Sequence, residues 1–319
     1  MKLLVAIPAF NEEKTVSEVI KNIPRSISGI ETLDILVIND GSNDNTKKLA
    51  SAAGARVFDF PEHLGLAKAF QKAVDTALSE HYDILVNIDA DMQFDPHDIP
   101  KLVAPVASGQ ADCVTASRFK DASLIPPMPV SKKWGNRKVA SLISFITGHK
   151  LYDVSCGFRA YSREALLNLN LFSKFTYTHE TILNLAFKGL TVLEMPIKVR
   201  GERQYGESKI ARSLWKYGYN IFNTIFRTIL DYKPLKFFGW AGASLFSIGI
   251  ILDLFIFIRL LAIGEVSPYK TVGFLGLALN IFGLLLFIVG LLADSINRTR
   301  ITQERVLYEV KKINLKSRN

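Results

Sequence analysis

The feature that most limits how this chain can fold is an apolar region at residues 235–294, where Leu, Ile, Phe, Gly and Ala predominate. It holds two long apolar stretches, residues 235–263 and 271–293, joined by a short link at 264–270. A helix needs about 20 apolar residues to cross the hydrocarbon core of a bilayer, and both stretches are long enough. The sequence therefore predicts two transmembrane helices that pack as an antiparallel hairpin.

Two charged side chains lie within the first stretch, although burying a charge in lipid is costly. Arg259 lies near the link, so its long side chain can reach towards the aqueous surface. Asp253 lies deeper in the stretch, and we expect it to face the second helix. The sequence alone assigns Asp253 no function.

Basic residues gather on both outer sides of the hairpin, in a chain whose net charge is +9. They are Arg200, Arg203, Lys209, Arg212, Lys216, Arg227, Lys233 and Lys236 before it, and Arg298, Arg300, Arg305, Lys311, Lys312, Lys316 and Arg318 after it. An excess of Lys and Arg beside membrane spans is typical of the cytoplasmic side. We therefore expect an integral protein of the cytoplasmic membrane, with both termini and the large amino-terminal part in the cytoplasm. The same clustering favours a membrane over nucleic acid as partner. The transmembrane helices of two chains could also pack together, so a homo-oligomer is possible.

The two cysteines, Cys113 and Cys156, are far apart and lack the spacing of a metal site. They predict neither a disulfide framework nor a zinc site, and they fit a reducing compartment. The first apolar run, residues 3–7, is too short for the core of a signal peptide and ends at a proline. We interpret it as the first buried strand.

Strands and helices alternate through the first hundred residues or so. Predicted strands lie at residues 3–7, 34–38, 56–60 and 84–88, with a further one at 114–117, and predicted helices lie between the first four. We expect Asn11 to cap the first of these helices. Such alternation is typical of an open parallel α/β sheet with helices on both faces.

Polar residues follow three of these strands, at positions 8–12, 39–42 and 89–91. Alone, the pair Asp89 and Asp91 fits a solvated turn as well as a site for a hard cation such as magnesium. In open α/β sheets, however, ligands bind outside the carboxyl ends of the strands. Convergence of three polar strand ends on one edge therefore favours a binding site. A dinucleotide site is disfavoured, because no G-x-G-x-x-G follows the first strand.

Two segments have the amphipathic character of membrane-interface helices. Residues 134–149 combine apolar side chains with the basic Arg137 and Lys138 and follow Lys132 and Lys133. They fit either an interfacial helix or a plain core helix. Residues 213–232 are the stronger candidate, because aromatic and basic residues interleave there directly before the hairpin.

Seven motifs, taken in order, resemble family 2 glycosyltransferases with the GT-A fold, in the branch that acts on polyprenyl phosphates. The motifs are Pro-Ala-Phe-Asn-Glu-Glu at 8–13, Asn-Asp-Gly-Ser-Asn-Asp at 39–44, Asp-Ala-Asp-Met-Gln at 89–93, Ser-Arg-Phe at 117–119, Gly-Asn-Arg at 135–137, Ser-Cys-Gly-Phe-Arg at 155–159 and Arg-Gln-Tyr-Gly-Glu-Ser-Lys at 203–209. The resemblance covers about residues 1–230. It implies a Rossmann-like, mostly parallel α/β sheet domain, followed here by interfacial amphipathic helices and the two transmembrane helices.

The resemblance also implies roles for individual residues. The nucleotide pocket would be lined by Pro8, Phe10, Glu12, Ile38, Asp40, Asp89 and Ala90. A divalent cation, manganese or magnesium, would be held by Asp89, Asp91 and Gln93. The acceptor phosphate would face Arg118, Arg137 and Ser208, with Asp91, Arg118, Arg137, Arg203 and Lys209 acting in catalysis. His63 stands where this family commonly has Asn.

The implied reaction moves a hexose, with inversion, from a GDP or UDP sugar to a dolichyl or undecaprenyl phosphate. A phosphate monoester is already ionised near neutral pH, so its oxygen needs no strong general base. A hydroxyl acceptor would need one, and His179 with Glu180 is then either that base or a structural pair. The alternatives are a glycosyltransferase that uses a hydroxyl acceptor in polysaccharide or glycolipid synthesis, and a sugar-nucleotide sensor without turnover.

The domain organisation that follows has four parts. Residues 1–210 form the catalytic domain and residues 211–234 an interfacial amphipathic helix. Residues 235–294 form the transmembrane hairpin, and residues 295–319 form a basic cytoplasmic tail.

Overall fold

The computed structural model describes the chain apart from residues 172–176, 201–222, 224, 228–229, 231 and 317–319. The chain divides into two compact units. One comprises Met1–Ile225 together with Val310–Asn319, and the other comprises Phe226–Glu309. The predicted division into four parts stays a prediction, and most of its second part falls outside the described residues.

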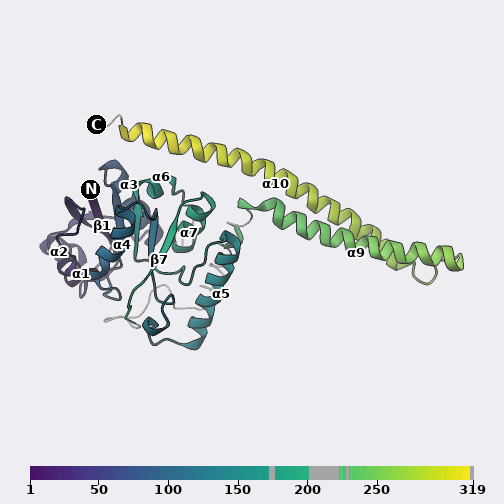
Figure 1. Cartoon of the computed structure of the whole chain (residues 1–319), viewed down its shortest axis with the longest axis horizontal. Coiled ribbons are helices and arrows are strands. Elements are labelled where there is room, and N and C mark those ends of the chain that lie inside the picture. Colours follow the sequence, from purple (N-terminus) through teal and green to yellow (C-terminus); the bar gives the residue numbers. More distant parts are fainter. Residues whose placement is uncertain (172–176, 201–222, 224, 228–229, 231, 317–319) are drawn as a thin grey trace. The chain divides into compact units, whose positions relative to one another are not determined.

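The first unit is built on a seven-stranded sheet with the order β3-β2-β1-β4-β6-β5-β7 (Figure 1). The strands are β1 Lys2–Ala9, β2 Thr32–Asn39, β3 Arg56–Asp59, β4 Ile84–Asn87, β5 Cys113–Ser117, β6 Arg159–Ser162 and β7 Val192–Pro196. Only β6 runs antiparallel, against β4 and β5, and the other pairs are parallel. The predicted mostly parallel α/β sheet is confirmed.

Helices cover both faces of this sheet, as the alternation predicts. They are α1 Val16–Asn22, α2 Thr46–Ala52, α3 Leu66–Ser79, α4 Ile99–Ala107, α5 Val130–Thr147, α6 Arg163–Asn168 and α7 Thr178–Phe187. Leu3, Val5 and Ile7 point into the core shared with α1 and α4, and the alternate residues Leu4 and Ala6 are fully buried as well. Burial on both faces explains why β1 reads as one continuous apolar run.

The amphipathic segment at residues 134–149 lies within α5. This helix buries only Ala140 and Ile143. Trp134 is 63% exposed and Phe145 is 87% exposed, so α5 is no core helix. Its exposed aromatic side chains suit the interfacial interpretation, and contact with a membrane stays a prediction.

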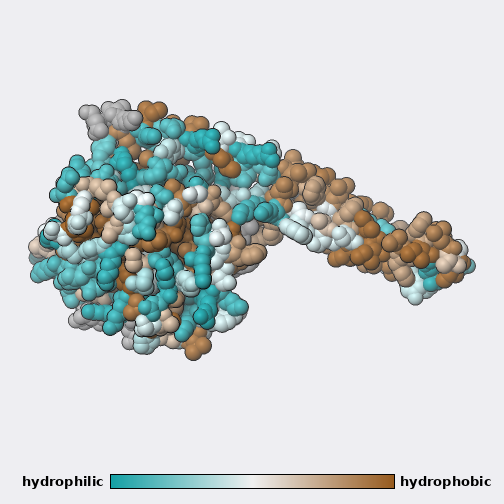
Figure 2. Space-filling model, viewed as in Figure 1, coloured by the Kyte–Doolittle hydropathy of each residue, from teal (hydrophilic) through white to brown (hydrophobic). Residues whose placement is uncertain are grey.

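The second unit contains helix α9, Pro234–Ile263, and most of helix α10, Lys270–Lys316. Both are long and apolar enough to cross a membrane by length and composition. Hydrophobic residues cover α9 and the amino-terminal part of α10 (Figure 2). The second predicted span and the tail after it form one continuous helix. Its last turns belong to the first unit, where Lys311 Nζ donates to the carbonyl oxygens of Leu167 and Leu169 at 3.3 and 3.1 Å.

Small residues bring α9 and α10 into backbone contact. A Cβ placed on Gly242 would lie 2.6 Å from the carbonyl oxygen of Gly283, which is closer than any side chain tolerates. Such small-residue interfaces are typical of helix packing in membranes. Asp253 faces α10 as predicted, because its Oδ2 accepts a 2.7 Å hydrogen bond from Asn280 Nδ2. Arg259 donates to the carbonyl oxygen of Ser267 in the link, so it points towards the end of the hairpin.

The close approach at Gly283 predicts a position-specific loss of stability. A Cβ on Gly283 would lie 2.7 Å from the backbone nitrogen of Phe246, whereas one on Gly273 would meet only Ile256, at 3.6 Å. We expect Gly283→Ala to lower the free energy of unfolding by about 1–3 kcal/mol, because the backbones must move apart. Thermal unfolding in detergent micelles checks this, with Gly273→Ala as control. Equal midpoints for the two variants would refute the packing.

Candidate active site

The three predicted polar segments meet at one edge of the sheet, because β1 lies between β2 and β4 and runs parallel to both. Pro8 and Ile38 are register partners just before this edge. The Asp40 N–H donates to the carbonyl oxygen of Ala9 at 2.8 Å, which carries the pairing to the strand ends. The predicted convergence is therefore confirmed, while the roles of single residues stay predictions.

The first two segments hold each other through side chains. The N–H of Asn11 donates to Ser42 Oγ at 2.9 Å, and Asn11 Oδ1 accepts from the N–H of Asn43 at 2.9 Å. The N–H of Glu12 donates to Thr46 Oγ1 at 2.8 Å. The prediction that Asn11 caps the first helix is wrong, since α1 begins at Val16. Asn11 has a left-handed φ of 53° and its amide fastens the neighbouring segment instead.

Asp40 anchors the turn that leads into α3. Its carboxylate accepts the N–H groups of Leu64 and Gly65 at 2.8 and 2.9 Å. His63 Nδ1 lies 2.9 Å from Oδ2 of the same carboxylate, and the imidazole stacks on Phe10 with ring centroids 4.0 Å apart. Phe10, Asp40 and His63 therefore form one cluster at the strand ends. His63, the departure from the family pattern, takes part in both contacts.

The acidic loop follows β4 and makes a tight turn. Asp91 is 3% exposed, and its Oδ1 accepts the N–H of Gln93 at 3.1 Å. Between them Met92 has a left-handed φ of 58°, while Ala90 is buried. The loop is thus fixed by its own hydrogen bond, with Asp89 and Asp91 on either side of a buried alanine.

The side chains of this loop fit a hard cation that takes further ligands from a substrate. No group of three or more His, Cys, Asp or Glu side chains that could hold a metal occurs among the described residues. Asp89, Asp91 and Gln93 offer carboxylate and amide oxygens, the donors that magnesium and manganese prefer. Both cations commonly complete their coordination with water and substrate phosphate oxygens, so a pair of carboxylates is chemically compatible with such a cation.

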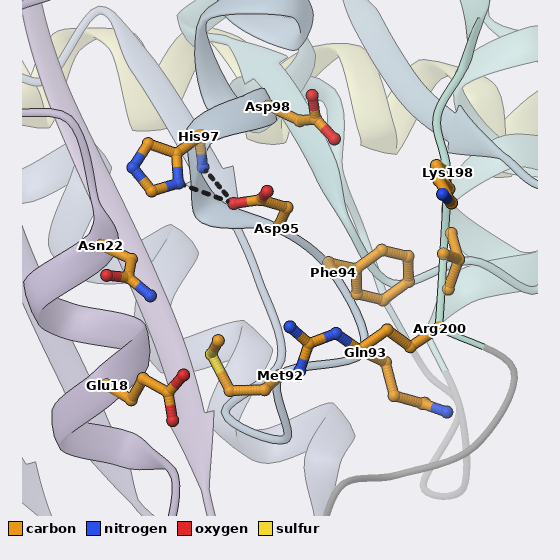
Figure 3. A pocket seen from close by; sticks show the side chains of 11 residues that line it. Glu18, Asn22, Met92, Gln93, Phe94, Asp95, His97, Asp98, Lys198 and Arg200 are labelled. Carbon is orange, nitrogen blue, oxygen red and sulfur yellow. Dashed lines mark hydrogen bonds and ion pairs between the residues drawn. The ribbon is translucent and has the colours of Figure 1, made fainter.

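A pocket of about 340 Å³ opens beside Gln93 (Figure 3). It is lined by Glu18, Asn22, Met92, Gln93, Phe94, Asp95, His97, Asp98, Lys198, Val199 and Arg200. The N–H of Arg200 donates to the carbonyl oxygen of Gln93 at 3.0 Å. This bond ties the residue that precedes segment 201–222 to the acidic loop. Within that segment, Arg203, Ser208 and Lys209 lie outside the described residues, so their predicted roles are not placed.

Arg118 follows β5 and forms a partly buried ion pair, in which its side chain is 16% exposed and that of Asp153 is fully buried. Its Nε and Nη2 donate to the two carboxylate oxygens of Asp153 at 2.6 and 2.8 Å, and Nη2 also donates to Ser155 Oγ at 2.6 Å. Burial alone would raise the pKa of Asp153, but the charge and hydrogen bonds of Arg118 hold it below its usual value. Arg137 is exposed on α5. The shared role of Arg118 and Arg137 at a phosphate stays a prediction.

Glu194 on β7 supports this ion pair, and the sequence did not predict it. Its carboxylate is buried and accepts the N–H groups of Tyr152 and Asp153 at 2.9 and 2.6 Å. These bonds fix the loop that presents Asp153 to Arg118. No local motif could have revealed Glu194, because it reaches across from a strand 41 residues away in sequence.

The pair His179 and Glu180 lies inside α7. His179 is 1% exposed, and burial lowers the pKa of its imidazole to about 3. Glu180 is 9% exposed. A general base must reach the proton that it removes, so burial of both side chains favours the structural interpretation of this pair.

The family model described as glycosyl transferase family 2 matches residues 4–169. The chain belongs to this family and is a glycosyltransferase, as the motifs predict.

Named relatives and a solved structure agree with this family. The UDP-N-acetylglucosamine–dolichyl-phosphate N-acetylglucosaminyltransferase of Methanococcus voltae is 29% identical over 216 residues, 61% of this chain and 84% of that one. The undecaprenyl-phosphate 4-deoxy-4-formamido-L-arabinose transferase of Shewanella sediminis is 26% identical over 313 residues, 92% and 86% of the two chains. Glucosyl-3-phosphoglycerate synthase of Mycobacterium tuberculosis, solved with Mn²⁺, UDP-glucose and glycerol 3-phosphate, superposes with a TM-score of 0.56 at 24% identity, covering 71% and 79%. The GT-A fold is thereby confirmed.

The buried Glu194 predicts a pH dependence of stability. Burial raises the pKa of its carboxyl from 4.5 to about 7, so between these values the folded chain keeps a proton that the unfolded chain has lost. This stabilisation is complete below pH 4.5 and is lost as pH rises through 7. Glu194→Gln mimics the protonated form and keeps an oxygen acceptor. We expect the free energy of unfolding of Glu194→Gln, relative to that of wild type, to increase by about 1–3 kcal/mol as pH rises from 5 to 8.

Unfolding midpoints of both proteins, measured at several pH values in that range, check this prediction. A difference between them that does not change with pH would mean that Glu194 does not titrate there.

Proposed function

We propose that this glycosyltransferase transfers a hexose from a nucleoside-diphosphate sugar to a polyprenyl phosphate at the cytoplasmic surface of a membrane. The observation that carries the proposal is the meeting of Asp89, Asp91, Asp40 and Phe10 at one sheet edge, in a chain with two helices long enough to span a bilayer. Relatives named for transfer to dolichyl and undecaprenyl phosphates support this acceptor class.

The donor would bind along the carboxyl ends of β1, β2 and β4. Phe10 and Asp40 would contact the nucleoside, together with Pro8, Glu12, Ile38 and Ala90. Asp89, Asp91 and Gln93 would hold a magnesium or manganese ion, which supplies charge neutralisation for a leaving diphosphate. The related synthase that was solved with Mn²⁺ and UDP-glucose has the same fold, which supports a divalent metal here.

The acceptor would arrive as a phosphate already ionised near neutral pH. Its oxygen can attack the anomeric carbon while the bond to the nucleoside diphosphate breaks, and no proton has to be removed. This fits the burial of His179 and Glu180. Arginine forks suit phosphate recognition, and Arg118 and Arg137, with Arg203, Ser208 and Lys209, are the candidates for this task.

Membrane attachment gives the acceptor access. A polyprenyl phosphate keeps its tail in the bilayer and its phosphate at the surface, so the site has to work against that surface. Helices α9 and α10 would anchor the chain, and the exposed aromatic side chains of α5 would rest in the interface. The basic residues around the hairpin support a cytoplasmic location for both termini.

The decisive test is an extraction assay with purified full-length protein in detergent. Radiolabelled UDP and GDP sugars are offered with undecaprenyl or dolichyl phosphate and Mg²⁺ or Mn²⁺, and the organic phase is counted. We expect label in the organic phase for one donor, dependent on lipid phosphate and abolished by EDTA. Label that enters only water-soluble products, or that never leaves the donor, would reject the lipid acceptor.

The acidic loop gives a sharper prediction for the same assay. Asp91→Asn keeps an oxygen for the N–H of Gln93 but removes the charge that a cation needs. We expect turnover to fall by about 10²–10³-fold, since several kcal/mol of charge stabilisation are lost. Asp75→Asn, on the exposed side of α3, is the matched control and should keep wild-type turnover. Equal turnover for both variants would remove Asp91 from the metal site.

A further inference from the structure

One side of the Asp89 carboxylate faces a glycine. A Cβ placed on Gly157 would lie 3.1 Å from Asp89 Oδ2, 3.4 Å from Asp89 Oδ1 and 3.4 Å from the hydroxyl of Tyr177. The φ of Gly157 is not left-handed, so its backbone conformation admits a side chain. A side chain at this position would therefore press against the Asp89 carboxylate rather than strain the backbone.

The backbone of Gly157 is held against the end of β4. Asn87 Nδ2, from the last residue of that strand, donates to the carbonyl oxygen of Gly157 at 3.1 Å and to the hydroxyl oxygen of Tyr177 at 2.8 Å. Asn87 is fully buried and lies two residues before Asp89. Both bonds start from the strand that carries the acidic loop, so Gly157 and Tyr177 are placed directly relative to Asp89.

Tyr177 has no freedom to move its hydroxyl. Its ring is fully buried and stacks on Phe70 of α3, with centroids 3.9 Å apart and planes 10° apart. Its hydroxyl accepts from Asn87 Nδ2 at 2.8 Å and donates to the carbonyl oxygen of Gly157 at 3.4 Å. The hydroxyl is thus held in the same hydrogen-bonded group as Gly157, next to the loop that carries Asp89.

A buried arginine fastens the two segments that supply these groups. Arg159 is fully buried, and it donates to the carbonyl oxygens of Val154 and Thr178 at 3.0 and 2.7 Å and to Thr181 Oγ1 at 2.5 Å. Among the described residues, its hydrogen-bond partners are all neutral oxygens. A buried charge without an ionic partner is costly, so these hydrogen bonds are needed to stabilise Arg159. They also join the loop of Gly157 to the helix that follows Tyr177.

We infer that Gly157 is a positioning residue for Asp89, acting with Asn87 and Tyr177 to fix the orientation of its carboxylate towards a divalent cation. The inference rests on the proposed function for the identity of that ion. Magnesium demands near-ideal geometry with oxygen ligands at about 2.0–2.1 Å. A methyl group at Gly157 would push the carboxylate by a few tenths of an ångström, which is enough to spoil that geometry.

The test measures metal affinity rather than turnover. Full-length protein in detergent is titrated with MnCl₂ at saturating UDP, and free Mn²⁺ is followed by electron paramagnetic resonance. We expect Gly157→Ala to weaken Mn²⁺ binding about 10–100-fold, the range typical for residues that orient a metal ligand. Tyr177→Phe, which keeps the ring and its stacking, should weaken it in the same direction.

Gly239→Ala is the matched control, because its added methyl meets only Leu235 Cδ1, at 3.8 Å. Its Mn²⁺ affinity should stay within about twofold of wild type, and thermal midpoints show whether each variant is folded. If folded Gly157→Ala and Tyr177→Phe both bind Mn²⁺ like wild type, the positioning role is rejected while the proposed function stands. If the wild type itself binds no Mn²⁺ with UDP, the metal site and this inference fall together.

Discussion

Parallel pairing of β1 with both β2 and β4 is the constraint on which the rest of the first unit depends. It places three strand ends side by side, so segments that are distant in sequence supply one edge with carboxylates, amides and an aromatic ring. Their polar groups then satisfy one another, as Asn11 does for Asn43 and Asp40 does for Leu64. Buried polar groups left without partners would destabilise the sheet edge. Positioning of the candidate site and stability of the fold therefore depend on the same bonds.

In the described part of the chain, the acidic loop and the basic side chain of Arg118 have different surroundings. Asp89 and Asp91 sit on a loop fixed by a hydrogen bond from the Gln93 N–H to the Asp91 carboxylate, with an asparagine and a glycine close by. Arg118 is instead embedded in a network of carboxylates, in which Glu194 orients the loop of Asp153 and Asp153 holds the guanidinium. A pre-oriented arginine loses little conformational freedom when a second anion arrives, although it must share its charge with Asp153.

Sequence patterns predict the elements whose formation depends on residues close together in the chain. The continuous apolar runs predicted β1, β2 and β4, because a strand buried on both faces tolerates only such residues. β6 is hard to predict, since Arg159 and Ser162 make it look polar and most hydrogen-bond partners of Arg159 lie in distant segments. The same reason hid Glu194 and Tyr177, whose partners lie far away in the chain. Asn11 was assigned as a helix cap because local spacing cannot show that Asn43 lies beside it.

The stacked pair of Phe10 and His63 would limit how a nucleotide donor enters the proposed site. Ring centroids 4.0 Å apart leave no gap that a third ring could occupy. A nucleobase that uses Phe10 must either cover the opposite face of its ring or eject the imidazole from its place. Displacement of the imidazole would also break its contact with Asp40. Donor binding and displacement of His63 would then occur together.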